Sequence, residues 1–386
     1  MILTIITFIL VLSVLVFVHE LGHFWVAKKC GVPAKEFGFG FPPRACGIYK
    51  NVDGKWKSVK GGKEVKDAKG TIYSLNWIPI GGFVQLGEDE TESDNPNHFI
   101  NKPIWQRVAM LSAGVIMNIV LAAVIISAGL MIGLPQVLSE EINSKAVITD
   151  KKIQIAEVLP GSPASIAEIK TGDIVLDIND NKFTKYEDLQ SFVNNNTGQE
   201  LNYKIKRGQD EIIAQITPEI REETGKGGIG VSIAETGIVK YPWYLAISEG
   251  IKMTFLLTWA IIVAFYELFK GIIIGKGVPS GVSGPVGIAV MAGQVADMGL
   301  VYVMNFTAIL SINLAIINFL PFPALDGGRV LFLFIEKIKG RPVKREVESA
   351  IHNIGFSLLM LLVLVVTFRD VAKFGDKFKM LFEKIF

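Results

Sequence analysis

Long apolar runs without charged residues divide the chain. Four of them contain no Lys, Arg or Asp, and Glu20 is their only acidic residue; they are residues 1–27, 108–134, 298–325 and 349–368. Each run is long enough to cross a hydrocarbon core of about 30 Å as a helix. The pattern predicts a polytopic α-helical membrane protein with about four transmembrane helices.

A fifth apolar stretch lies between Lys252 and Glu267. Its length of about 14 uncharged residues is below the usual spanning length, which favours a re-entrant or interfacial helix. We therefore predict an amphipathic, membrane-associated helix over residues 241–275.

The charges between the spans predict their direction. Residues 28–69 contain eleven Lys and Arg against four acidic residues, which indicates a cytoplasmic segment. The first span then runs inward and the second returns. If residues 252–266 do not span, the third span runs inward again, and the basic residues from Lys337 to Arg345 are also cytoplasmic. This arrangement leaves residues 135–245 outside.

Residues 150–235 show the short alternating strands of a separate soluble module. Two predicted strands, 153–158 and 174–178, flank the string Pro160-Gly161-Ser162-Pro163-Ala164 and a later Gly172-Asp173. This order resembles the PDZ family, and the alternative is an unrelated β-rich domain. The resemblance implies an extracytoplasmic α+β PDZ domain, which binds extended peptides at a sheet edge.

A second β element is predicted beside the bilayer. Residues 71–86 carry several large apolar side chains and the pair Gly81-Gly82, which predicts a β-hairpin turned by these glycines. Such backbone is tolerated within a membrane only where protein or a water-filled cavity surrounds it. The hairpin is either re-entrant beside an active site or an ordinary cytoplasmic hairpin.

Composition agrees with a membrane protein. Half of the 386 residues are hydrophobic, and the mean hydropathy is +0.41. The net charge of +2 gives no case for nucleic acid as a partner, and two cysteines are too few for a disulfide framework.

The first span carries the string His19-Glu20-Leu21-Gly22-His23. Positions i and i+4 share one helix face, so both imidazoles can reach a single Zn²⁺. Zinc lowers the pKa of a bound water toward about 7, and Glu20 can act as the catalytic base. Three ionisable groups in a membrane run are costly unless they bind something, which favours this function over two histidines that merely contact neighbouring helices.

Asp326 is the strongest candidate for a third ligand. His98 lies in a polar loop, where we expect it to be solvated, and His352 lies in the last span, where we expect a hydrogen bond to a neighbouring helix. Asp326 follows two prolines that would interrupt the third span near its inner end, and two glycines after it allow a tight turn. The four-span arrangement places Asp326 at the same depth as His19 and His23. A helix-capping aspartate at the membrane surface is the alternative.

The pentad His19–His23 and the string from Asn318 to Gly328 together resemble the site-2 protease family of intramembrane zinc metalloproteases. The resemblance is to the bacterial branch with an extracytoplasmic PDZ module, although this chain has room for one such domain instead of two. Ser283-Gly284-Pro285-Val286-Gly287 is similar to the same branch. The order of the segments along the chain matches that of this branch over nearly the whole length. The predicted segments are 1–27, 28–103 with the hairpin, 104–134, 150–235, 241–275, 298–325, 349–368 and an amphipathic C-terminal helix at 369–386.

The resemblance implies a zinc metalloendopeptidase of the bacterial inner membrane. Its substrates would be single-span membrane proteins, either an anti-sigma factor or remnant signal peptides, and membrane lipid would surround it. Asp326 would be the third zinc ligand, and Asn313 and Asn318 would bind substrate or simply bond neighbouring helices. Gly81 and Gly82 would belong to the substrate-holding hairpin. A metal transporter and an inactive PDZ-bearing scaffold are the rival functions.

Overall fold

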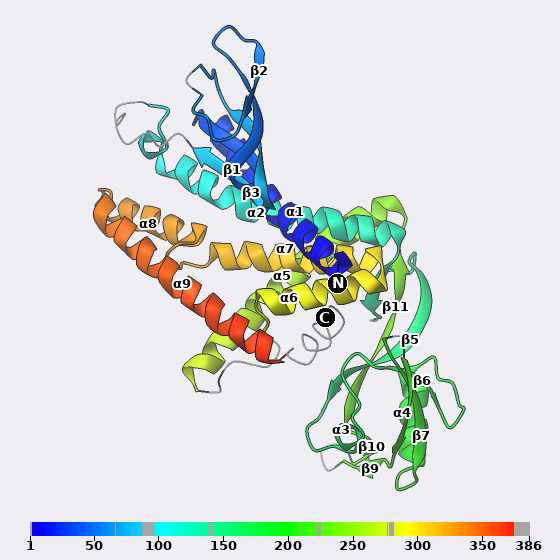
Figure 1. The fold of residues 1–386 in the computed structure, drawn as a ribbon. Coiled ribbons are helices and arrows are strands. Elements are labelled where there is room, and N and C mark those ends of the chain that lie inside the picture. Colours follow the sequence, from blue (N-terminus) through cyan, green and yellow to red (C-terminus); the bar gives the residue numbers. More distant parts are fainter. Residues whose placement is uncertain are drawn as a thin grey trace, which may run out of the picture. The chain divides into compact units, whose positions relative to one another are not determined.

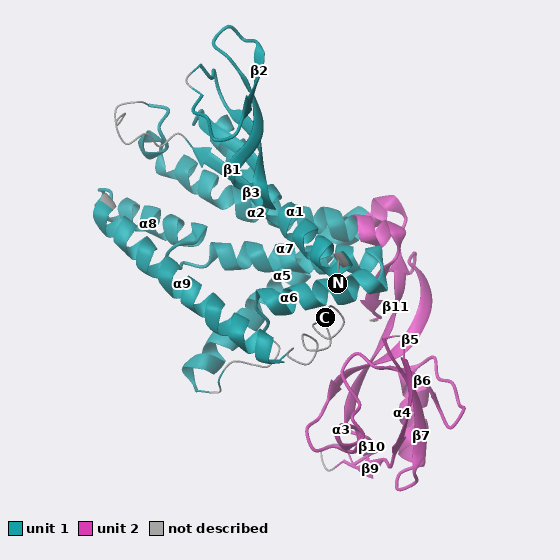
Figure 2. Ribbon diagram, in the orientation of Figure 1, with its two compact units in different colours: residues 1–127, 247–386 teal, residues 128–246 magenta. Residues whose placement is uncertain are grey.

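Apolar helices dominate one unit of the chain, and a six-stranded sheet dominates the other (Figure 1; Figure 2). The first unit comprises residues 1–127 and 247–386, and the second comprises residues 128–246. The computed structural model describes residues 2–65, 67–86, 96–138, 142–208, 210–221, 225–275, 277 and 282–373. The predicted amphipathic helix at 369–386 lies outside the described residues beyond Lys373.

Seven long helices occur in the described residues. They are α1 (Ile2–Lys29), α2 (Ile104–Ile132), α5 (Trp243–Ile273), α6 (Pro285–Met298), α7 (Leu300–Phe319), α8 (Asp326–Lys339) and α9 (Arg345–Lys373). By length and composition, α1, α2, α5, α7 and α9 can each cross a membrane. The chain is therefore a multi-pass membrane protein.

Helix α5 corrects the length argument made from the sequence. The apolar stretch is part of one uninterrupted helix of 31 residues, which contains an 18-residue window with a mean hydropathy of 1.8. Lys252 and Glu267 lie within this helix and do not end it, because both favour helical backbone. The premise that this segment is too short to span is wrong.

Helix α6 was not predicted, and it packs against α1 and α7. A side chain at Gly293 would meet Thr4 of α1 at 2.5 Å, so this glycine allows the two helices to approach closely. At the other end of α6, the N–H groups of Gly284 and Gly287 donate to the buried carboxylate of Asp370 on α9, at 2.9 and 2.7 Å. This bond explains the Ser-Gly-Pro-Val-Gly string, because a carboxylate satisfies the free N–H groups of a helix start.

A three-stranded sheet follows α1. It consists of β1 (Ala34–Lys50), β2 (Trp56–Lys60) and β3 (Ile72–Leu86), in the order β2-β1-β3. Both β1 and β3 reverse direction, so Phe37 lies opposite Val84 on one side and opposite Tyr73 on the other. The predicted hairpin with arms paired to each other is wrong, because the two arms of β3 flank the first part of β1.

Aromatic packing attaches this sheet to α1. The ring of Phe37 stacks on Phe24 with centroids 4.7 Å apart, and its centroid lies 5.4 Å from that of Phe17. Such pairs stabilise a packed interface beyond their buried area. The sheet is therefore fixed along the helix that carries the zinc motif.

The second unit is a six-stranded sheet with the order β4-β11-β5-β6-β7-β8. Its strands are β4 (Leu134–Val137), β5 (Val147–Val158), β6 (Ile174–Ile178), β7 (Leu201–Arg207), β8 (Asp210–Ile216) and β11 (Val231–Lys240), with a separate pair β9 (Glu219–Ile220) and β10 (Gly227–Gly228). Helices α3 (Pro163–Ile166) and α4 (Tyr186–Asn195) accompany it. Alternate residues of the strands, such as Tyr203 and Ile205, form its buried core.

An ion pair with a buried carboxylate is also part of this unit. Arg207 donates to both carboxylate oxygens of Asp173, at 2.8 and 2.7 Å, and the Lys170 N–H donates to the same group. Burial of Asp173 opposes its ionisation, but the bonds from Arg207 and Lys170 outweigh this and lower the pKa of Asp173. The carboxylate therefore stabilises the folded unit in its charged form.

We predict that Asp173→Asn destabilises this unit by about 2 kcal/mol at pH 7, since a hydrogen-bonded charge pair is lost. Because the pKa of Asp173 is lowered on folding, its contribution is complete above the unfolded value of about 3.9. The contribution disappears as the pH falls from there through the lower folded value.

Hydrogen exchange of β6 and β7 in the detergent-solubilised chain measures this effect. Glu211→Gln removes the exposed pair with Lys204 and serves as the control without a measurable change. Equal protection of β6 and β7 in the wild type and in Asp173→Asn at pH 7 would contradict the prediction.

Candidate metal centre and catalytic site

Helix α1 places His19 and His23 on one face, one turn apart. Their rings meet edge to face with centroids 4.7 Å apart, and their Nε2 atoms lie 3.1 Å from each other. The two side chains are only 8% and 11% exposed. Both Nε2 atoms are therefore directed to one buried point, as the i, i+4 spacing predicts.

Helix α2 holds the other nitrogen of each ring. The Met110 carbonyl lies 2.8 Å from Nδ1 of His23, and the amide of Asn118 lies 3.5 Å from Nδ1 of His19. Between them, a side chain at Gly114 would meet His23 Nε2 at 2.5 Å. These three positions are four residues apart, so one face of α2 supports both rings.

The amide of Asn118 is informative because its oxygen is buried and has no partner among the described residues. A metal bound at Nε2 of His19 leaves a proton on Nδ1, which then needs an acceptor. Amide oxygen and nitrogen are assigned from such networks, and turning the Asn118 amide supplies the acceptor and satisfies the oxygen.

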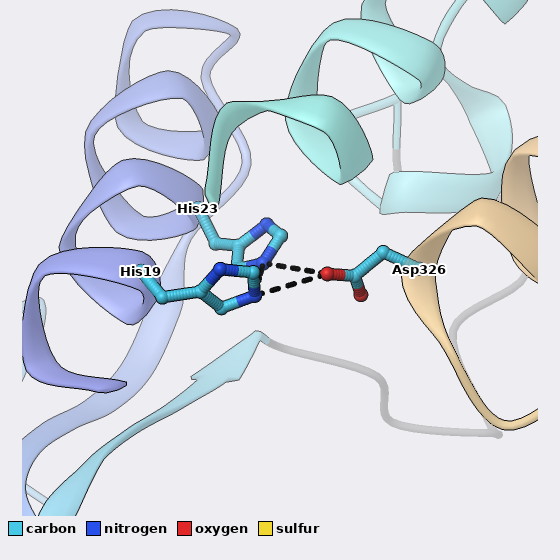
Figure 3. A group of neighbouring side chains, drawn as sticks. All are labelled: His19, His23 and Asp326. Carbon is cyan, nitrogen blue, oxygen red and sulfur yellow. Dashed lines mark hydrogen bonds and ion pairs between the residues drawn. The ribbon is translucent and has the colours of Figure 1, made fainter. Parts of the chain in front are cut away.

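Asp326 comes from the opposite side of the centre. It is the first residue of α8, and its Oδ2 lies 3.0 Å from His19 Nε2 and 3.4 Å from His23 Nε2 (Figure 3). The carboxylate faces both imidazoles across the gap between α1 and the α7–α8 junction. The sequence predicted this convergence of residues 307 positions apart.

The three side chains fit a zinc ion. One donor atom from each lies within 4.8 Å of the other two, and the set consists of two imidazole nitrogens and one carboxylate oxygen. This is a composition found in catalytic zinc sites, where water takes the fourth position. The supported Nδ1 atoms leave both Nε2 atoms available for the metal.

Glu20 borders a cavity of about 180 Å³ next to these ligands. The backbone N–H of Val84 on β3 donates to the Glu20 carboxylate. The cavity is lined by Val16, His19, Glu20, Leu314, Asn318, Ala324, Leu325 and Asp326. The Glu20 carboxylate, two of the three potential metal ligands and the Asn318 amide thus share one space.

Gly81 and Gly82 bring β3 against α1 just before the zinc motif. A side chain at Gly81 would meet Val16 at 2.7 Å, and one at Gly82 would meet the Cα of Phe17 at 3.2 Å. The Ser13 hydroxyl donates to the Pro79 carbonyl at 2.9 Å. The structure therefore shows these glycines as close-packing positions, which hold the strand beside Glu20.

The two predicted asparagines differ in position. Asn318 lines the cavity, whereas the amide of Asn313 donates to the Ile309 carbonyl of its own helix at 3.0 Å. Asn313 is not among the residues that line this cavity. Its amide satisfies a bond within α7, not the bond to a neighbouring helix that was considered for it.

Sequence reasoning missed several contributors. Asn118 and Gly114 lay in an apparently featureless span, yet their four-residue spacing with Met110 and the presence of a buried amide were readable signals. His98 was expected to be solvated but is buried, at 7% exposure. The hydrogen bond from Val84 had no sequence signal, since a backbone group provides it.

The second unit has its own groove, with a cavity of about 340 Å³. Helix α4 contributes Leu189 and Val193, and β11 contributes Val231 and Ile233. Arg221 and Lys226 add positive charge at the same cavity. An apolar groove between a helix and a strand, with basic residues at its border, can accept an extended acidic or carboxylate-ended peptide.

Known proteins resemble this chain over almost its whole length. The model of peptidase family M50 matches residues 7–362. The zinc metalloprotease RasP of Geobacillus kaustophilus is 31% identical over 454 residues, covering 96% of this chain and 98% of that protein. The regulator of sigma-W protease RasP of Bacillus subtilis is 30% identical, with coverage of 96% and 98%.

One solved structure that matches is the PDZ domain of the SdrC-like protein from Listeria monocytogenes. It is 21% identical, and the match covers 22% of this chain and 92% of that domain, with a TM-score of 0.21.

Apolar helices that bring two histidines and an aspartate together, with a glutamate at the adjoining cavity, define an integral-membrane metallopeptidase. The chain belongs to peptidase family M50, the site-2 protease family, and its metal is zinc.

We predict that Asn118→Ala lowers zinc affinity by about 10- to 100-fold, the usual cost of losing a partner of a metal-bound histidine. The His19 Nδ1–H would lose its acceptor in a buried site. Chelator competition on the purified protein measures the affinity.

Asn313→Ala is the matched control for Asn118→Ala, because it removes the same amide from a membrane helix away from the ligands. Its zinc affinity is expected to equal that of the wild type. Unchanged affinity in Asn118→Ala would show that Asn118 does not support His19.

Proposed function

We propose that the protein is an intramembrane zinc endopeptidase that hydrolyses peptide bonds in transmembrane segments of single-span proteins. The observation that carries the proposal is the convergence of His19, His23 and Asp326 beside Glu20, on helices suited to a membrane. These four residues would be expensive inside a bilayer without a shared function.

In this proposal His19, His23 and Asp326 hold the metal, and Glu20 acts as the base. Zinc bound there would lower the pKa of a water and polarise the carbonyl of the scissile bond. Glu20 takes the proton of the attacking water and later donates it to the leaving nitrogen. The Val84 N–H keeps the Glu20 carboxylate at the cavity, next to His19.

The substrate must lose its helical hydrogen bonds before its carbonyl can be attacked. The second arm of β3 pairs with β1 through residues 82–86, and it lies next to Glu20. An unwound substrate segment can add to this arm as a further strand and recover backbone hydrogen bonds. Asn318, which lines the same cavity, is placed to donate an amide hydrogen to the reacting carbonyl.

The proposed topology has five full spans. If α5 runs inward, the short helix α6 can return the chain part of the way before α7 runs inward again. The 14 residues of α6 measure about 21 Å at 1.5 Å per residue, less than the hydrocarbon core. Asp326 and the basic residues after α8 then stay on the cytoplasmic side, and the second unit stays outside.

The substrate class follows from one relative and from the second unit. A relative is called a regulator of sigma-W protease, which suggests an anti-sigma factor as substrate, with remnant signal peptides as the other candidate. We place the protein in the bacterial inner membrane with an extracytoplasmic PDZ module. Its groove would either bind a carboxyl terminus left by an earlier cut or exclude uncut proteins by size.

The rival functions explain fewer residues. A metal transporter would use the three ligands but has no use for Glu20 held beside them by Val84. A scaffold would need the second unit but not a buried metal centre. The transporter leaves Glu20 without a purpose, and the scaffold leaves the whole pentad and its α2 support without one.

We predict that Glu20→Gln abolishes cleavage of a single-span model substrate in liposomes and retains about one zinc per chain, because Glu20 is not a ligand. Asp326→Asn is expected to lose both cleavage and tightly held zinc. Cleavage is followed by gel, and zinc is quantified after dialysis against a chelator.

Equal processing by the wild type and Glu20→Gln would refute the proposed base. Zinc retained at wild-type affinity in Asp326→Asn would refute the ligand assignment, and zinc lost on dialysis of the wild type would favour a transport site.

A separate prediction concerns the second unit. If it excludes uncut proteins, deletion of residues 150–235 makes full-length substrates cleavable, whereas a carboxylate receptor predicts that cleavage of pre-cut substrate is lost. Val193→Glu, which places a charge in the groove, is expected to impair only the receptor function. Comparison of cut and uncut substrates with both variants separates the two roles.

A further inference from the structure

The segment that presents Asp326 is short and constrained. It runs from Leu320 to Leu325 between α7 and α8, and it contains two prolines whose φ angles are nearly fixed. Ala324 has φ +78°, a left-handed conformation that residues with a Cβ atom adopt only when their surroundings enforce it. The direction of the following residues, Asp326 included, depends on this angle.

Helix α9 supplies the bond that can enforce it. The N–H of Ala324 donates to Nδ1 of His352 at 2.8 Å. Because Nδ1 accepts this bond, the ring proton of neutral His352 resides on Nε2. The ring also contacts Phe332 of α8, with centroids 5.4 Å apart, so the imidazole joins the segment, α8 and α9.

A second position on α9 fits the same segment. A side chain at Gly355 would meet Pro323 Cβ at 2.4 Å and the Pro323 carbonyl oxygen at 2.7 Å. Gly355 lies one turn from His352 on the same face of the helix. The backbone of Pro323 and Ala324 is therefore seated directly against α9.

We propose that His352 is a positioning residue for the metal centre. Its Nδ1 holds Ala324 in the left-handed conformation, and this directs the Asp326 carboxylate to within 3.0 Å of His19 Nε2. His352 does not contact the metal ligands or the substrate cavity, so it acts through two residues of backbone. The inference rests on the proposed function, in which Asp326 is a zinc ligand.

The test uses three substitutions of His352 in the full chain. In His352→Asn the amide oxygen lies close to the position of Nδ1 and keeps an acceptor there. His352→Leu keeps the apolar contact with Phe332 but removes the acceptor, and His352→Gln carries its amide oxygen near the position of Nε2 instead. Asn353→Ala on the exposed side of α9 is the control.

Zinc affinity is measured by chelator competition, and kcat and KM are measured on a model substrate. We expect His352→Leu and His352→Gln to bind zinc at least about 10-fold more weakly and to lose kcat with little change in KM. His352→Asn is expected to stay within about 3-fold of the wild type, and Asn353→Ala to match it. Thermal unfolding of the zinc-free proteins separates a general loss of stability from a loss of zinc affinity.

A compensating substitution tests the backbone step directly. Glycine adopts positive φ without the steric cost that alanine bears, so Ala324→Gly makes the left-handed conformation less dependent on His352. The double variant His352→Leu/Ala324→Gly is expected to recover at least about 3-fold in zinc affinity over His352→Leu.

Wild-type zinc affinity in His352→Leu and His352→Gln would overturn the inference. Equal losses in His352→Asn and His352→Leu would do the same, because the acceptor would then be irrelevant. Asp326→Asn is the reference: if it loses zinc while the His352 variants do not, only this inference fails. If Asp326→Asn itself keeps zinc, the proposed ligand set fails as well.

Discussion

The contact between the two imidazoles of α1 and the carboxylate of Asp326 is the constraint on which the rest of the membrane unit depends. Polar side chains on membrane helices are costly, and their cost is offset only where they meet one another or a metal at the same depth. Distances of 3.0 and 3.4 Å from Oδ2 to the two Nε2 atoms require α1 and the α7–α8 junction to be held in register. Most of the close contacts around the site serve that register.

Small residues make this register possible. Gly114 lets α2 lie directly behind both histidine rings, and Gly293 lets α6 approach the start of α1. A Cβ atom at Gly327 or Gly328 would lie 2.3 Å from a backbone carbonyl oxygen of the segment before them. Both glycines therefore pack directly on that backbone. Because helices in lipid associate through close packing more than through exclusion of water, such glycines carry much of the specificity of the fold.

In the proposed function, the sheet next to α1 is the element that receives the extended substrate. Stacked phenylalanines fix the sheet to α1, and the glycines of β3 bring a backbone N–H within reach of Glu20. In that function, one element would both position the base and offer a strand for pairing. This double use would account for a β structure with exposed Trp77 and Leu75 beside membrane helices.

Local sequence predicted the membrane class, His19 and His23 on one face of α1, and Asp326 as their distant neighbour, and the structure brings these three side chains together. Each of these depends on an uncharged run, on helical periodicity or on proline and glycine positions, which adjacent residues specify. The length of α5, the existence of α6 and the exchange of partners between β1 and β3 were decided by tertiary structure. The partners of Val84 and His352 were also decided by tertiary structure, because each contacts a residue far away in the chain. For Asn118 the sequence offered only its four-residue spacing with Met110 and Gly114 as a signal. A sequence shows which chemical groups are present and at what spacing along the chain. Hydrogen bonds between backbone and side-chain atoms that are distant in the chain form only once the helices have packed.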